Sequence, residues 1–464
     1  MIKKLLSSFV LSLLLFSPEA QAMDVTTKEP GKLAEQLTDS IRFTIDSLTV
    51  SGPLNGDDLK LIRLIANREK TKTIGERLLV SLDLSKAVIV EMKKKMPVTT
   101  NSLPNGFLSG CESLQRLVLP DSLLSLGRNS LAGCSGLAEV KIPVMVKAIG
   151  VGALKGCSLL KEITVPASVM KIDDDVFSDC TQLEKAVFEC RMEELPDGIF
   201  EDCENLTVIK TPTPVRKIGK SAFEDCKMLA GYDVSEVTII GSSAFKGCMS
   251  LAEIDLPQSL TRIGSHAFEG CTSLKTVTVP TRVRELGDAA FMDCILLDSV
   301  SIAGQLEKLE GNTFRKCQSL RVVRLPLSLR VLGDNVFMDC ITLSDIKLPV
   351  ALRTIGDNAF SGCSSLKSIV IPVSCTSIGG NAFRECSQLT TVELPSGLKK
   401  IGGGAFMKCA SLSDVVLKSP TPPSISSNTF KGTNYCRFIV PKGANVRYYN
   451  DKKWSKVSSV FVEQ

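Results

Sequence analysis

The sequence of 464 residues has one histidine, one tryptophan and few aromatic residues of any kind, at 5% of the chain. A Ser-His-Asp arrangement would have to use His266, the only histidine, and no nucleophile elbow or phosphate-binding glycine loop is present. A glycoside hydrolase needs only two carboxyl groups, and the chain has adjacent carboxylates such as Glu193 and Glu194, or Asp173 to Asp175. Adjacent acids of this kind usually belong to a solvated surface. We therefore expect no enzyme and no cofactor.

The chain also lacks a strong charge of either sign. It has 55 Lys and Arg against 50 Asp and Glu, for a formal net charge of +5. A balance this weak and dispersed does not favour nucleic acid or an anionic membrane surface as a partner.

Long apolar runs are absent except at the N-terminus. There, Lys3 and Lys4 precede an apolar run from Leu5 to Phe16, followed by the small-residue site Ala20-Gln21-Ala22. This order is typical of a secretory signal peptide, so we expect cleavage after residue 22 and an exported protein at the cell surface, outside the cell or in the periplasm. No later stretch approaches eighteen consecutive apolar residues, so we expect no membrane helix in the mature chain.

Cysteines are absent before Cys111 and then recur at a fixed interval. Fourteen of the 17 cysteines follow one register, 23 residues apart in every interval but one, which is 22. These are Cys111, Cys134, Cys157, Cys180, Cys203, Cys226, Cys248, Cys271, Cys294, Cys317, Cys340, Cys363, Cys386 and Cys409. A period of this length indicates a repeat architecture.

Each repeat carries the pattern C-x-x-L-x-x-V-x-L-P-x-S-L-x-x-I-G-x-x-A-F-x-x-C. The alternating apolar residues before the proline predict a short strand that ends where the backbone N–H is missing. One strand cannot bury its apolar face alone, but stacked copies form a continuous core. We therefore predict a β-rich solenoid of about 14 to 15 coils of 23 residues, roughly 70 Å long at the spacing of parallel strands, with a parallel sheet on one face.

The two ends depart from this pattern. Residues 23–100 lack the cysteine register and read as strands with one short helix, which predicts a small α+β N-terminal cap domain. Residues 101–418 form the predicted solenoid. Residues 419–464 contain "SPTPPS" and an aromatic-bearing tail, which predict a last coil and a C-terminal cap.

The stretch "SLTRIGSHAFEGCTSLKTVTVP" and its copies resemble the BspA-like leucine-rich repeat proteins, which are surface or secreted proteins of anaerobic bacteria. The resemblance covers roughly residues 101–441. It implies adhesion to, or recognition of, macromolecules of a host or a neighbouring cell, and it implies no catalytic residues.

The fourteen repeated cysteines are predicted to be buried packing residues, because one residue type at one position of every coil is typical of a core. Disulfides are the alternative in an exported chain. Neighbouring side chains in a stacked row point the same way, whereas a disulfide needs a dihedral near 90°, so we expect mostly reduced thiols. Cys375 replaces an apolar core residue, Cys190 lies in a coil without its proline, and Cys436 lies in the last strand; their redox state is left open.

His266 is predicted to be a turn residue. The equivalent positions of the other coils hold mostly Asn, Gly, Ser or Asp, which are the residues of turns with left-handed φ. A zinc site would need three or four converging ligands, and one histidine beside a straight row of cysteines cannot supply them. We therefore expect no metal site.

The outward-facing strand positions are the candidate binding surface. In the coils after Cys317, Cys340 and Cys363 they include a basic group made of Arg321, Arg324, Lys347 and Lys367, although such residues also simply keep a sheet soluble. We expect a monomer that binds a host or bacterial surface protein, or a glycan. Two alternatives stay open. One is a glycan-binding accessory protein that uses Tyr449 or Trp454, and the other is a structural envelope component without a foreign ligand.

Overall fold

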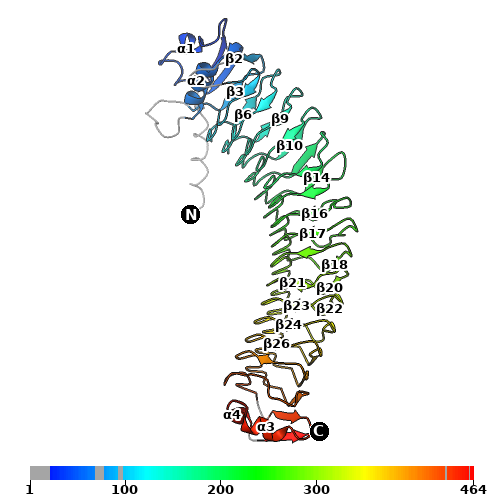
Figure 1. The fold of residues 1–464 in the computed structure, drawn as a ribbon. Coiled ribbons are helices and arrows are strands. Elements are labelled where there is room, and N and C mark those ends of the chain that lie inside the picture. Colours follow the sequence, from blue (N-terminus) through cyan, green and yellow to red (C-terminus); the bar gives the residue numbers. More distant parts are fainter. Residues whose placement is uncertain (1–20, 68–77, 92–97, 434–435, 459) are drawn as a thin grey trace, which may run out of the picture.

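The computed structural model describes residues 21–67, 78–91, 98–433, 436–458 and 460–464. They form an elongated, curved parallel β-solenoid of about 18 turns, with the first and last strands at opposite ends of the stack (Figure 1). The predicted leucine-rich repeat solenoid is therefore confirmed. The expected signal peptide falls almost wholly on residues 1–20, which lie outside the described residues.

A first row of strands comes from the segment before each proline. Their partners are in parallel register and usually 23 residues apart, as in the pairing of Thr276 with Ser299. The strands are β1 (Ala22–Thr26), β2 (Ser47–Leu54), β3 (Ser81–Asp83), β6 (Arg116–Val118), β8 (Glu139–Val140), β10 (Glu162–Val165), β12 (Lys185–Phe188), β14 (Val208–Lys210), β18 (Thr276–Val279), β20 (Ser299–Ile302), β22 (Val322–Arg324), β25 (Ser368–Val370), β27 (Thr391–Leu394), β29 (Asp414–Leu417), β30 (Arg437–Val440) and β31 (Phe461–Glu463). Pairing is interrupted after β8, β14 and β22.

A second row of short strands comes from the segment before the Gly of each coil. Its members are β4 (Ala87–Ile89), β5 (Ser102–Leu103), β7 (Ser125–Leu126), β9 (Ala148–Ile149), β11 (Lys171–Ile172), β13 (Glu194–Leu195), β15 (Lys217–Ile218), β16 (Ile239–Ile240), β17 (Arg262–Ile263), β19 (Glu285–Leu286), β21 (Lys308–Leu309), β23 (Val331–Leu332), β24 (Thr354–Ile355), β26 (Ser377–Ile378) and β28 (Lys400–Ile401). From β5 onward this row is interrupted between β11 and β13 and again between β19 and β21.

The turn before each cysteine forms a third hydrogen-bonded side. In the coil of His266, the backbone N–H groups of His266, Phe268 and Gly270 each donate to a carbonyl of the next coil at 2.8 Å. The backbone of His266 and Gly270 is left-handed, with φ of 58° and 70°. This conformation lets their N–H groups point along the stack. The sequence-based prediction of left-handed φ at His266 is thus met.

The core consists of residues that repeat once per coil. Phenylalanine rings stack from Phe177 to Phe430, with neighbouring centroids 5.2 to 5.9 Å apart. From Cys134 to Cys409 each registered thiol is buried and donates to a carbonyl of the preceding coil. For Cys271 the acceptor is the carbonyl of Phe245, 3.1 Å from Sγ. Each of these thiols therefore has one defined carbonyl acceptor in the preceding coil.

At the N-terminal end, helix α1 (Leu33–Gln36) packs beside α2 (Gly56–Ala66). The Asn55 side chain accepts from the backbone N–H of Asp58, and the Asp58 carboxylate accepts from the backbone N–H of Asn55, which is a capping box. Strands β1 to β3 continue the first row of the solenoid. The segment predicted as an N-terminal cap therefore shares a sheet with the repeats.

At the C-terminal end, α3 (Asn445–Asn450) and α4 (Trp454–Val457) lie between β30 and β31. Trp454 and Tyr448 are fully buried, and they donate to the carbonyls of Pro423 and Ser419 at 2.8 and 2.9 Å. This aromatic group covers the end of the phenylalanine stack through the contact of Trp454 with Phe430. The tail thus closes the core against solvent.

Replacing Cys271 by Asp is expected to destabilise the stack. A carboxylate at this buried position has no cation partner, and burying an unpaired charge costs several kcal/mol, in the range of about 3 to 5 kcal/mol. Chemical denaturation followed by circular dichroism would measure the loss. The matched control is Thr281→Asp, because Thr281 is exposed and Asp121 already stands at the equivalent position of another coil. Equal stability of the two variants would contradict a packing role for the thiol.

Candidate binding face

The four predicted basic residues are all exposed, but they do not lie on one unbroken sheet. Arg324 ends β22, whereas Arg321 and Lys367 lie just before β22 and β25. The coil that carries Lys347 has no strand in the first row, so strand pairing is interrupted between β22 and β25. Beneath this basic group the coils therefore stack without a regular first-row ladder.

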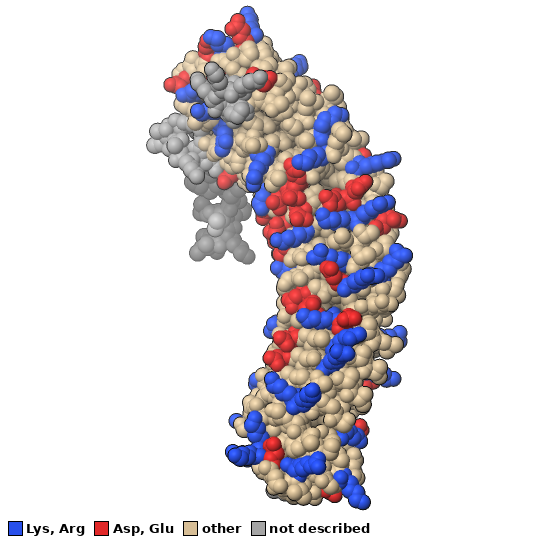
Figure 2. All heavy atoms as spheres, viewed as in Figure 1, with Lys and Arg blue, Asp and Glu red and all other residues tan. Residues whose placement is uncertain are grey.

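The ion pairs of these residues differ. Arg321 Nε lies 2.5 Å from the Asp298 carboxylate. Among the described residues, no carboxylate comes within 4.0 Å of the charged groups of the other three, Arg324, Lys347 and Lys367. On the face seen in Figure 2, Asp and Glu gather beside Lys and Arg in the N-terminal half, whereas the coils nearer the C-terminus show mainly Lys and Arg. Three unpaired cations are thus available to a ligand.

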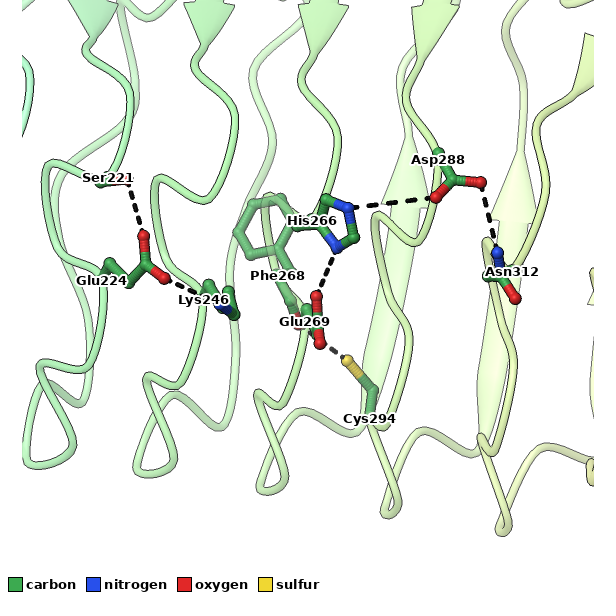
Figure 3. A network of polar contacts seen from close by, with 9 residues as sticks. All are labelled: Ser221, Glu224, Lys246, His266, Phe268, Glu269, Asp288, Cys294 and Asn312. Atoms are coloured by element: carbon green, nitrogen blue, oxygen red, sulfur yellow. Dashed lines mark hydrogen bonds and ion pairs between the residues drawn. The ribbon is translucent and has the colours of Figure 1, made fainter.

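His266 lies between two carboxylates (Figure 3). Its Nδ1 is 2.5 Å from Glu269 Oε2, and its Nε2 is 4.0 Å from Asp288 Oδ2. Asn312 donates to the same Asp288 carboxylate at 3.4 Å. With a carboxylate facing each ring nitrogen, the imidazole is held as part of the turn.

Cys271, the cysteine closest to His266 in sequence, points into the core. Burial raises the pKa of the Cys271 thiol well above its usual range, and the neighbouring Cys248 adds to the shift. A nucleophilic thiol needs the opposite, a lowered pKa and access to solvent. Within the described ranges no group of three or more His, Cys, Asp and Glu is placed to hold a metal ion.

The three cysteines outside the register occupy different settings. Cys190 and Cys375 are buried, and burial raises the pKa of Cys375 to about 11. Cys436 is the least buried of the seventeen, and partial burial together with the nearby Asp414 charge raises its pKa to about 12. Of all the thiols, Cys436 is the one placed to meet a reagent first.

The aromatic residues weighed for sugar stacking are accounted for by packing. Trp454 has no exposed surface, so neither face of its indole is open to a ligand. Tyr449 is partly exposed, and its ring meets Phe461 edge-on with centroids 5.3 Å apart. The C-terminal aromatic group therefore acts as a cap.

Two hollows of the surface were missed by the sequence reasoning. One, of about 700 Å³, lies over β6 and β8 and includes Arg116, Glu139 and Lys141. The other, of about 500 Å³, lies where β11 and β13 fail to pair. Its second coil is one of the four that lack the proline, with Glu189 in that place.

The three-sided parallel coils, with a leucine at a fixed place in each, define a leucine-rich repeat protein. The sequence matches the model of the BspA type leucine rich repeat region over residues 101–230, 238–364 and 330–456. The chain belongs to this family.

One solved structure gives the same result. A leucine-rich repeat protein from Bacteroides ovatus ATCC 8483 is 30% identical, with 71% of this chain and 86% of that chain covered and a TM-score of 0.56. A leucine rich cell surface protein from Faecalibacterium prausnitzii A2-165 is 22% identical, with 71% and 85% covered and a TM-score of 0.40. No curated protein matches the chain. In the part of the chain that the structure describes, no helix is long and apolar enough to cross a membrane.

Replacing His266 by Asn is expected to leave stability unchanged, because Asn312, Asn335 and Asn358 hold the same left-handed turn position in other coils. His266→Val is the contrasting variant. A β-branched residue at positive φ is strained by about 1 to 3 kcal/mol, so it should lower the unfolding midpoint. Denaturant titrations of both variants would measure this. If His266→Asn lost much stability and His266→Val lost none, the contacts of the imidazole, and not the backbone conformation, would be what stabilises this turn.

The thiols are expected to be reduced and protected in the folded protein. Alkylation in the native state should label Cys436 first, and its rate should still rise as the pH passes the ordinary thiol pKa, because the pKa of Cys436 is about 12. Denaturation without reductant should then expose all 17 cysteines to the reagent, counted by intact mass. Few labelled cysteines after denaturation would mean that disulfides are present.

Proposed function

We propose that this protein is an exported, non-catalytic scaffold that binds a protein of a host or bacterial surface. Membership of the BspA-type family supports a binding role, and the Bacteroides relative has the same architecture. The export signal expected at residues 1–22 supports a location at the cell surface or outside the cell.

The observation that carries this proposal is the preformed outward face of the coils. Beneath the basic group the coils are hydrogen-bonded to one another in the second strand row and in the turn before each cysteine, so little backbone entropy is lost when a partner docks. Arg324, Lys347 and Lys367 stand on that face without an ion-pair partner among the described residues. A ligand with carboxylates facing these cations fits best, and recognition is spread over several modest contacts.

The test is a binding screen with residues 23–464 on arrays of host matrix proteins, bacterial surfaces and polysaccharides. A ligand found there should lose about tenfold in affinity for the variant Arg324→Glu, Lys347→Glu, Lys367→Glu, since three exposed ion contacts contribute about 0.5 kcal/mol each. Lys141→Glu is the matched control, because Lys141 is exposed and occupies the strand position of Arg324 in another coil.

Three results decide the proposal. Binding to a protein that the triple variant weakens and the control does not would support it. Binding only to polysaccharide would favour the glycan-binding alternative. No binding on any array, together with protease resistance of the protein on intact cells, would overturn it.

A further inference from the structure

An exposed apolar ridge lies on the corner between the two strand rows. Leu327, Val350 and Val373 directly follow the proline of three successive coils, and they are 80%, 75% and 79% exposed. The pairing of β23, β24 and β26 places them one parallel-strand spacing apart, about 4.8 Å. Val370, 65% exposed, lies beside them. These four residues are called the ridge below.

The ridge is bordered by positive charge. In its three coils, the strand and corner positions (residues 320–332, 343–355 and 366–378) hold six cations and a single acid, Asp345. Arg353 is exposed, and within the described chain no carboxylate lies within 4.0 Å of it. Apolar side chains and unpaired cations side by side fit a partner surface that is apolar in the middle and acidic at its rim.

The chain itself carries a surface of that kind. The groove of about 500 Å³ between β11 and β13 contains Met170, which is 84% exposed, together with Met192 and Val169. Five carboxylates line the groove against three cations, and they belong to Asp173, Asp174, Glu193, Glu194 and Asp197. This set of residues is called the acidic groove below.

The charge of the acidic groove is only partly balanced. Lys171 Nζ lies 2.7 Å from Asp173, and Lys217 Nζ lies 2.7 Å from Glu194. Partial burial and the carboxylates of its neighbours raise the pKa of Asp174, which shows that negative charge is crowded here. Glu193 is exposed and has no cation within 4.0 Å among the described residues. A positively charged side chain of a partner would therefore be stabilised by the carboxylates of the acidic groove.

The ridge and the acidic groove face the same side of the solenoid. Arg353 and Glu193 occupy the same place in their coils, thirteen residues after Cys340 and Cys180. Those two coils are seven repeats apart, or about 34 Å at the spacing of parallel strands. Two chains placed antiparallel can therefore set each ridge against the other chain's acidic groove, and the two contacts are equivalent by two-fold symmetry.

We propose that the chain forms an antiparallel dimer in which the ridge of each copy docks in the acidic groove of the other. The partner is thus a second copy of this chain. This inference goes beyond the proposed function and does not rest on it, because the charge pair that tests the dimer, Arg353 with Glu193, lies outside the set Arg324, Lys347 and Lys367 that carries the proposed function. The monomer expected from the sequence is the alternative that the charge exchange below tests.

A charge exchange tests the dimer directly. Sedimentation velocity of residues 23–464 should show a monomer–dimer equilibrium that shifts toward monomer as salt is raised. Arg353→Glu and Glu193→Arg should each be monomeric, because each places like charges at both contacts. An equimolar mixture of the two variants should recover the dimer, since both of its contacts then pair opposite charges.

The apolar part has its own variant and control. Leu327→Ser with Val350→Ser and Val373→Ser should abolish the dimer, whereas Leu296→Ser should not, because Leu296 is exposed and lies in the turn after a cysteine, away from the corner that carries the ridge. Circular dichroism would show that each variant is folded. A wild-type chain that stays monomeric at low salt, or single charge variants that their mixture does not rescue, would overturn the proposal. Loss of the dimer without loss of ligand binding would leave the proposed function intact.

Discussion

Every coil must match both of its neighbours at one fixed spacing, and this constraint decides the rest of the structure. It is met on three sides by backbone hydrogen bonds and inside by the leucine, phenylalanine and cysteine rows. The carbonyl of Phe245 shows how closely the parts are fitted. It accepts the N–H of Cys248 in its own coil and the thiol of Cys271 in the next. A larger or charged side chain at the cysteine position has no room and no partner there.

The same constraint explains why so much of the fold could be predicted from the sequence. The thiol contact between neighbouring coils repeats from Cys134 to Cys409, so the pattern of allowed residues is visible within one chain. That pattern identified the strand before the proline, the buried thiols and the left-handed turn at His266. The N-terminal segment carries no such repeat, and its continuation of the first strand row became visible only in three dimensions.

The candidate sites were less predictable, because the surface of a repeat protein is where the pattern imposes little. The basic residues could be placed on the outward face, and the ion pair of Arg321 with Asp298 follows from their spacing of 23 residues, which puts them at the same place in successive coils. The interruption of pairing beside Lys347 has no such signature, because it depends on how one coil sits against the next. The acidic groove arises in the same way, beside the coil in which Glu189 replaces the proline.

Positions that the coils share therefore support the fold, whereas positions that depart from the repeat are the ones that can face a partner. A residue that the coils share is held by its neighbours and has little freedom to acquire another role, as Cys271 shows in the core. Leu327, Val350 and Val373 follow the prolines at a place where other coils carry Asp121 or Thr281. Three successive exposed apolar residues add nothing to a core that is already filled, and exposing them to water is unfavourable. A partner surface that covers them removes that cost, which is the physical reason to look for interactions at this corner of the solenoid.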